Sequence, residues 1–406
     1  MRFAVPGSRR GRHAARPGPG TPRARGDECR GRIERDPAGK WSRCGVVEDA
    51  RRDPDGASGG PGVGAPTLRR AVGIGASAGG VEALLELVGS LDPGLPAPVL
   101  VTVHQPADAS TVLPQLLARR GPLPAAHARD GETLQPGRIY VAPPDHHLLV
   151  DKEGTAVLSR GPKENGHRPA VDPLLRSLAL HVGAGAVGIV LSGALDDGAS
   201  GMLEVVRHGG TGLVQDPEQA LYPSMPRAAL DQVPGALVEP AGLLGAALSR
   251  VLGRDLPGTA TGRGSSRLLW EVAVARMEAP EMTDIDPPGT AAGLACPDCA
   301  GPLFELHDGG AVRYRCRVGH AWSQHALGSE QDHSVETALY MALRALEDKA
   351  ALQRRIAATA AKQGADRVVA RARDAADEAV RSAGVLRRLL AGTPGTYDDP
   401  HGKGPA

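Results

Sequence analysis

The chain has 406 residues and a formal charge of +1, and hydrophobic residues make up 41% of it. That length allows two or three domains. Only ten residues are aromatic, which is too few for the stacking platform that binds single-stranded nucleic acid. No run of 18 or more uncharged apolar residues occurs, and the N-terminus lacks an apolar signal core. We therefore expect a cytoplasmic protein with no membrane insertion.

Residues 1–67 are rich in arginine, proline and glycine, and their apolar residues follow neither helical nor strand spacing. Without a core to offset the ordering entropy, this segment is predicted to be a disordered basic tail. Residues 1–70 carry 16 basic and 8 acidic side chains, whereas the rest of the chain has an acidic excess. A nucleic-acid-binding arm is the alternative, but any arginine-rich, GC-biased coding sequence has the same bias, and we expect no nucleic acid partner.

Residues 68–252 alternate between apolar strands and amphipathic helices. The predicted strands are 71–75, 99–103, 138–142, 147–150, 186–191 and 212–215. One predicted helix ends near residue 88, and the others span 111–120, 172–182, 199–208 and 243–252. This alternation predicts an α/β domain with a doubly wound, mostly parallel sheet covered by helices on both faces. Strands 138–142 and 147–150 are expected to form a hairpin around a Pro-Pro-Asp turn.

The remainder of the chain divides into three predicted segments. Residues 253–292 are predicted to be a linker with a short helix around 268–277, and residues 293–323 a small metal-binding module. Residues 333–391 are predicted to form an antiparallel helical hairpin broken at Gly364, through which the chain self-associates. Its second helix carries a heptad seam of residues spaced alternately three and four apart: Val369, Ala372, Ala376, Ala379, Ala383, Leu386 and Leu390.

A serine lies in a glycine-rich turn after the first predicted strand. Gly75-Ala76-Ser77-Ala78-Gly79 matches the G-x-S-x-G nucleophile elbow, where a sharp strand-to-helix turn exposes the hydroxyl and the following amide faces a developing oxyanion. Gly73-x-Gly75-x-x-Ala78 also fits a dinucleotide-binding turn. That alternative needs an acidic residue at the end of the second strand, where His104 stands instead.

Two further candidate groups follow other predicted strands. His104 comes directly after strand 99–103, and Asp196 and Asp197 follow strand 186–191 in a glycine loop. Catalytic groups in open α/β sheets collect at the carboxyl ends of strands. Serine, histidine and aspartate from three strand ends meet the requirement for a Ser-His-Asp hydrolase, and spacing alone leaves either aspartate able to orient the imidazole.

Several motifs in this region together resemble the catalytic domain of the CheB-type protein-glutamate methylesterases, over about residues 72–247. The motifs are Gly75–Gly80, Val103–Pro106, Arg138–Pro143, Leu191–Gly198 and Ser224–Arg227. The resemblance implies that Ser77 is the nucleophile, His104 the general base and Asp197 the orienting carboxylate. It also implies that the amides of Ala78 and Ala194 form the oxyanion hole, and that catalysis needs no cofactor.

The chain departs from the family pattern in ways that bear on control and substrate. The family usually has methionines where Gln105 and Ala194 stand and asparagine where Asp196 stands. A second carboxylate beside the triad is expected to disfavour an acidic receptor surface. Residues 1–67 are too short and too polar for the receiver domain that precedes this domain in chemotaxis enzymes, so we do not expect control by phosphorylation.

Three cysteines and a histidine have the spacing of a closed zinc site. Cys296-x2-Cys299 and Cys316-x3-His320 supply four ligands for a tetrahedral, structural Zn²⁺. A similar module behind stand-alone methylesterase-like domains implies docking or assembly rather than chemistry. We therefore expect hydrolysis of a small ester to survive removal of the metal or of everything after Leu252.

These observations predict a serine hydrolase that demethylates glutamyl methyl esters on a methylated chemoreceptor-like protein. Glutamine deamidation through the same acyl-enzyme changes only the leaving group. One alternative is a related esterase that acts on a non-chemotaxis protein or a small molecule. The other is a non-catalytic scaffold whose zinc module and helices bind partners.

Overall fold

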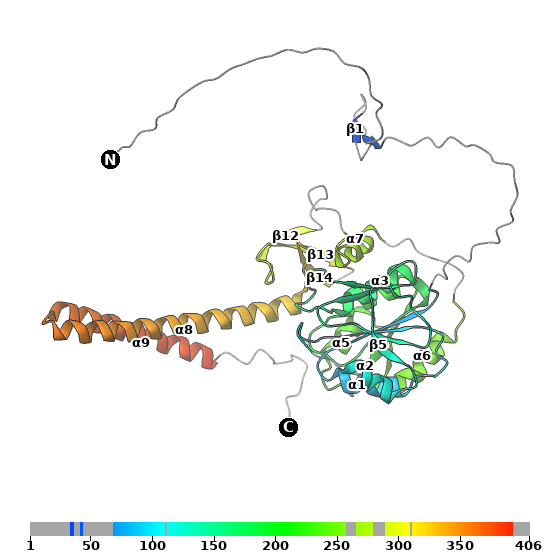
Figure 1. The fold of residues 1–406 in the computed structure, drawn as a ribbon, viewed down its shortest axis with the longest axis horizontal. Coiled ribbons are helices and arrows are strands. Elements are labelled where there is room, and N and C mark those ends of the chain that lie inside the picture. The colour runs from blue at the N-terminus through cyan, green and yellow to red at the C-terminus, as the bar shows by residue number, and fades with distance from the viewer. Residues whose placement is uncertain are drawn as a thin grey trace, which may run out of the picture. The chain divides into compact units, whose positions relative to one another are not determined.

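A computed structural model of the chain divides into two units, residues 1–62 and residues 63–406, which are described separately (Figure 1). The described residues are 33–35, 41–43, 68–109, 112–256, 265–278, 289–308 and 311–392. The predicted disordered tail therefore lies outside the described residues, apart from two short strands. These strands, β1 (Ile33–Arg35) and β2 (Trp41–Arg43), pair antiparallel, which the sequence analysis did not predict.

A seven-stranded sheet forms the centre of the second unit. Its strand order is β11-β10-β9-β3-β4-β6-β5, and every neighbouring pair is parallel. The strands are β3 (Ala71–Ala76), β4 (Val99–Val103), β5 (Ala125–His127), β6 (Ile139–Val141), β9 (Ala186–Val190), β10 (Thr211–Gln215) and β11 (Leu237–Glu239). The predicted α/β fold class is confirmed.

Helices cover both faces of this sheet and bury two separate apolar clusters. One cluster joins the sheet to α1 (Gly80–Gly89), α2 (Leu113–Arg120) and α6 (Leu244–Leu252). The other joins it to α3 (Val171–His181), α4 (Ala199–Arg207), α5 (Ser224–Gln232) and α7 (Ser266–Ala275). Strands covered on both faces need apolar side chains on both, which explains the fully buried β3, β4 and β9.

The predicted hairpin of strands 138–142 and 147–150 is wrong. β6 hydrogen-bonds β4 on one side and β5 on the other, so it has no free edge for the next strand. β7 (His147–Val150) instead pairs antiparallel with β8 (Ala156–Ser159) in a separate two-stranded sheet. The strands β5, β8 and β11 and the helix α5 were not predicted.

The segment predicted as a linker contains a packed helix and the start of a sheet. Leu268, Val272 and Ala275 of α7 are buried in the same cluster as α3. The strands β12 (Thr290–Ala295), β13 (Pro302–Asp308), β14 (Ala311–Cys316) and β15 (Ala321–Ser323) form an antiparallel four-stranded sheet in that order. We call residues 289–326 the C-terminal module.

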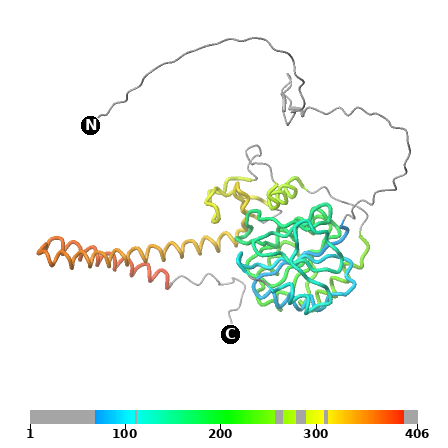
Figure 2. Tube along the Cα trace, in the orientation of Figure 1, coloured from blue at the N-terminus to red at the C-terminus, as the bar shows by residue number. Residues whose placement is uncertain are grey.

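Two long helices follow the module, α8 (Gln324–Lys362) and α9 (Asp366–Gly392), joined by a turn with Gly364 at φ +71° (Figure 2). The predicted seam positions from Val369 to Ala383 are buried. α8 begins nine residues before the predicted start, because the Ser323 hydroxyl caps it by accepting from the Ala326 amide. No helix in the described ranges has an apolar stretch long enough to cross a bilayer.

Candidate active site

Ser77 lies in the turn between β3 and α1. The chain turns at Gly79, whose φ of +65° is a conformation that favours glycine. A Cβ at Gly80 would lie 2.6 Å from the Ala76 Cβ and 2.8 Å from the Ser192 carbonyl oxygen. The two glycines therefore allow this turn to pack against the neighbouring loop, which hydrogen-bonds the Ser77 amide through the Ser192 carbonyl at 3.0 Å.

His104 follows β4, the strand next to β3, and its imidazole connects the other two predicted residues. Its Nδ1 lies 3.1 Å from Ser77 Oγ, and its Nε2 lies 2.7 Å from Asp197 Oδ2. The backbone amide of His104 donates to the Ala76 carbonyl at 3.1 Å, which fixes the strand ends against each other. Only 6% of the His104 side chain is exposed. The structure thus brings the three predicted residues into one hydrogen-bonded chain.

Asp197 is buried in the loop after β9, against the N-terminus of α3. Its carboxylate accepts hydrogen bonds from the amides of Val171, at 2.7 Å, and Asp172, at 3.1 Å, as well as from His104. Burial alone would raise the pKa of Asp197, but the hydrogen bond and charge of His104 and the two amides outweigh it and lower the pKa to about 2. Asp197 is therefore a carboxylate at neutral pH.

This charge assigns the tautomer of the His104 ring. A carboxylate only accepts hydrogen bonds, so the nitrogen that faces Asp197, Nε2, carries the proton. The neutral ring then presents the Nδ1 lone pair to the Ser77 hydroxyl. Such an arrangement can take the hydroxyl proton as oxygen attacks an electrophile.

The loop after β9 passes close to Ser77. A Cβ at Gly193 would lie 2.9 Å from the Ser77 Cβ and 2.0 Å from the Met225 sulfur, so only glycine allows this approach. The amides of Ala78 and Ala194 donate to no other group in the described part of the chain. They are thus available to an oxyanion that forms beside Ser77.

His167 is a residue of the site that the sequence analysis missed. Its ring stacks on the His104 ring, with centroids 3.8 Å apart and an interplanar angle of 18°. It ends the turn Glu164-Asn165-Gly166-His167, in which Asn165 and Gly166 have φ values of 52° and 76°. Burial and the adjacent His104 lower the pKa of His167 to about 4. The Asn-Gly pair is a turn signal, but no sequence pattern indicates the stacking partner.

The four predicted metal ligands lie together in the C-terminal module. The ligand atoms of Cys296, Cys299, Cys316 and His320 are all within 4.8 Å of one another. Tetrahedral zinc, with Zn–S bonds of about 2.3 Å, separates two sulfur atoms by about 3.8 Å and a sulfur from a nitrogen by about 3.5 Å. The Cys299 and Cys316 sulfurs are 3.6 Å apart, and the Cys316 sulfur is 3.5 Å from His320 Nδ1. The cluster fits a divalent ion of this type.

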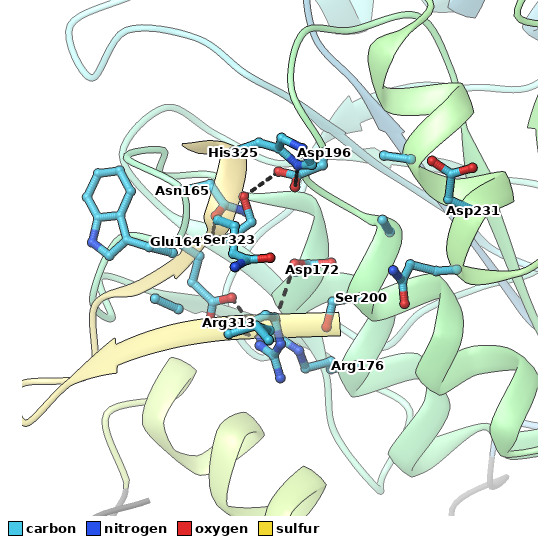
Figure 3. A pocket seen from close by; sticks show the side chains of 17 residues that line it. Glu164, Asn165, Asp172, Arg176, Asp196, Ser200, Asp231, Arg313, Ser323 and His325 are labelled. Atoms are coloured by element: carbon cyan, nitrogen blue, oxygen red, sulfur yellow. Dashed lines mark hydrogen bonds and ion pairs between the residues drawn. The ribbon is translucent and has the colours of Figure 1, made fainter. Parts of the chain in front are cut away.

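Asp196 points toward Ser323 and His325 of the C-terminal module (Figure 3). Its carboxylate accepts from Ser323 Oγ at 2.6 Å and contacts His325 Nδ1 at 3.2 Å. It lines a cavity of about 190 Å³ between the loop, α5 and the module, and neither Ser77 nor His104 lines this cavity. The C-terminal module therefore contacts the residue next to Asp197.

Comparison with known proteins gives the same family as the motifs. Residues 72–248 match the family model described as CheB methylesterase. A curated relative, "Protein-glutamate methylesterase/protein-glutamine glutaminase 2" of Xanthomonas oryzae pv. oryzae, is 43% identical over 166 residues, which are 40% of this chain and 46% of the relative. The enzyme of Azospirillum brasilense named protein-glutamate methylesterase/protein-glutamine glutaminase is 40% identical over 161 residues, 39% of this chain and 41% of the relative.

The solved structures that are similar include the catalytic domain of Thermotoga maritima CheB methylesterase. It is 31% identical, with a TM-score of 0.44, and the match covers 45% of this chain and 98% of that one. The chain spans just under half the length of the curated relatives named above.

Proposed function

We propose that residues 72–248, which belong to the CheB methylesterase family, hydrolyse glutamyl methyl esters on a methylated chemoreceptor-like protein in the cytoplasm. The observation that carries this proposal is the chain of hydrogen bonds from Ser77 through His104 to the buried Asp197. The names of the relatives support the ester class, since each includes a protein-glutamate methylesterase.

In the proposed acylation step, Ser77 Oγ attacks the carbonyl carbon of the methyl ester while His104 Nδ1 takes the hydroxyl proton. Asp197 holds the ring in the required tautomer and stabilises the imidazolium. The amides of Ala78 and Ala194 donate hydrogen bonds to the carbonyl oxygen and stabilise the negative charge that develops on it. When the C–O bond to the methoxy group breaks, the imidazolium gives its proton to the leaving oxygen. Methanol departs, and the glutamyl group remains bound to Ser77 as an ester.

Deacylation repeats these roles with water as the nucleophile. His104 takes a proton from the water that attacks the acyl-enzyme, and then returns it to Ser77 Oγ as the new glutamate carboxylic acid leaves and ionises. A glutamine side chain would enter the same cycle with ammonia as its leaving group. Deamidation is therefore part of the proposal, in keeping with the glutaminase in the relatives' names.

The test measures methanol released from a receptor fragment that carries labelled methyl esters. Wild-type protein should release methanol, and Ser77→Ala should slow release by about 10⁴-fold or more. Ser249→Ala, on α6, serves as the matched control because it removes a serine hydroxyl from a helix that contributes no residue to the triad.

The outcomes of this test separate the candidate functions. Equal release by wild type and Ser77→Ala would contradict the proposal. Ser77-dependent turnover of simple esters without release from the receptor would instead assign the domain to a different ester substrate. No turnover of any ester would favour a binding scaffold.

We also infer that Cys296, Cys299, Cys316 and His320 hold one structural Zn²⁺. Four protein ligands leave no open position for a reacting water, and bound zinc would supply folding energy to a module with a small apolar core. None of the reaction steps above involves the metal.

The helical hairpin is the part of the chain through which we propose self-association. Five apolar side chains of α8 are exposed by more than a third, and the exposed side chains of α9 add four more: Val335, Tyr340, Met341, Leu352, Ile356, Val368, Val380, Val385 and Leu389. Light scattering of the full chain should give more than one chain per particle, and removal of α8 and α9 should give one.

A further inference from the structure

Ser323 joins the C-terminal module to two loops of the candidate active site. Its backbone amide donates to Asn165 Oδ1 at 2.8 Å, and its hydroxyl donates to Asp196 Oδ1 at 2.6 Å. The same hydroxyl accepts from the Ala326 amide at 3.0 Å as the N-cap of α8. One residue thus connects the turn before His167, the loop of Asp197 and the start of the long helix (Figure 3).

The first connection holds the turn that carries His167. The Asn165 amide donates to the Ala321 carbonyl at 2.8 Å, and the Ala321 amide donates to the Lys163 carbonyl at 3.2 Å, so β15 runs alongside the turn. Glu164 makes a buried ion pair with Arg315 of β14 at 3.0 Å. The module therefore holds the turn that carries His167, whose ring stacks on His104.

The second connection holds the loop between β9 and α4. Leu195 packs against the apolar cluster of the module that contains Cys296, Cys316 and Trp322. Asp196 accepts hydrogen bonds from the module, and the next residue, Asp197, is the partner of His104. Every residue from Ala194 to Asp197 therefore lies within one or two positions of a contact with the module.

This loop needs external support because its backbone is strained. Leu195 has a φ of +61°, in the left-handed region that is unfavourable for a residue other than glycine. Such a conformation persists only where surrounding contacts hold it. The contacts from Leu195 and Asp196 to the module hold the middle of the loop, and hydrogen bonds of Gly193 with Tyr222 and Met225 hold its start. A shift of about 1 Å in a catalytic group lowers a rate by about 100-fold.

We propose that the C-terminal module is a positioning element of the active site, and that Ser323 is the positioning residue that ties its two loops together. The proposal rests on the proposed function for its activity readout. It predicts that small-ester hydrolysis is lowered when the module is removed, which is the opposite of the expectation from the sequence. Because Ser323 also caps α8, a displacement of the helical hairpin would move the same two loops.

Four variants separate positioning from folding. Ser323→Ala removes the hydroxyl, Ser323→Thr keeps it, and Ser323→Asp keeps a good helix cap but places a carboxylate against Asp196. Ser265→Ala is the matched control, because Ser265 caps α7 by accepting from the Leu268 amide at 3.1 Å and has no bond to either loop.

We expect Ser323→Ala to lower kcat for a small ester by about 10- to 100-fold, with KM changed less than about threefold. Ser323→Thr should restore kcat to within about threefold of wild type, and Ser323→Asp should lose more than Ser323→Ala although its helix remains capped. The melting temperature should fall equally in Ser323→Ala and Ser265→Ala, whose kcat should stay near wild type. Equal kcat in these two alanine variants would overturn the proposal.

Hydrogen exchange of the full-length protein gives a readout that does not need activity. In Ser323→Ala the amides of 164–167 and 193–198 should exchange at least about tenfold faster, with no change at the Ser77 turn. Unchanged exchange in both loops would overturn the proposal even if the rate fell. Faster exchange in a protein that turns over no ester would support positioning and reject the proposed function.

Discussion

Lowering the pH should destabilise the folded protein through His167, whose ring is stacked on His104. Burial and the neighbouring His104 lower its pKa to about 4, whereas a histidine in an unfolded chain has a pKa of about 6.5. Between these values the unfolded chain binds a proton that the folded chain does not. The stability that depends on neutral His167 is therefore complete above about pH 6.5 and is lost progressively as the pH falls toward 4.

The size of the effect follows from the two pKa values. With about 6.5 unfolded and about 4 folded, the free energy of unfolding falls by about 2 kcal/mol between pH 7 and pH 5. Asp172 acts in the opposite sense, because burial raises its pKa to about 7 and protonation then stabilises the fold. A difference between two proteins that both contain Asp172 isolates the contribution of His167.

The assay is urea unfolding followed by far-UV circular dichroism, at pH 7 and pH 5, on wild type and His167→Gln. The advantage of wild type over the variant should shrink by about 2 kcal/mol at pH 5, because glutamine does not titrate. His307→Gln, on an exposed side chain of the module, is the control for losing a histidine. An advantage that is the same at both pH values would refute the assignment of a neutral, stacked His167.

Two further predictions concern the loop acids and the metal. Asp197→Asn should lower kcat for a small ester by about 10⁴-fold, because it favours the wrong tautomer of the His104 ring. Asp196→Asn should lower kcat only a few-fold, because its amide oxygen still accepts from Ser323. Steady-state kinetics measure both values, and a large loss in Asp196→Asn with a small one in Asp197→Asn would make Asp196 the partner of His104. Elemental analysis should find one zinc per chain in wild type and none in Cys316→Ser. Without the metal, the module of the variant should lose its β-sheet signal. Zinc retained by Cys316→Ser would contradict the four-ligand site.

The position of the site could be predicted because Ser77 and His104 directly follow strands of apolar residues and Asp197 lies in the loop after another such strand. Ser77, His104 and Asp197 come after β3, β4 and β9, and β3 lies between the other two in the sheet. Parallel strands place their carboxyl ends together, so the order of elements was enough to gather these side chains. The glycine-rich turns next to these residues could also be predicted, because they depend on the local sequence.

The parts that could not be predicted depend on which distant segments meet. The stacking of His167 on His104 and the bond from Ser323 to Asp196 join separate elements, and one sequence contains no periodic pattern for such contacts. The predicted hairpin failed for a related reason, because pairing of β6 is decided by β4 and β5 rather than by the nearby turn. The buried arginines Arg176 and Arg315 likewise look like surface residues until Glu164 is placed beside them.

Covalent labelling of Ser77 tests the central claim most directly. The wild-type protein should react with a fluorophosphonate probe, and peptide mass spectrometry should locate one adduct on Ser77, since its hydroxyl alone has His104 Nδ1 within hydrogen-bond distance among the described serines. Ser77→Ala should not be labelled, and Asp197→Asn should be labelled far more slowly. Labelling of Ser77→Ala at the wild-type rate, or an adduct on another serine, would contradict the account.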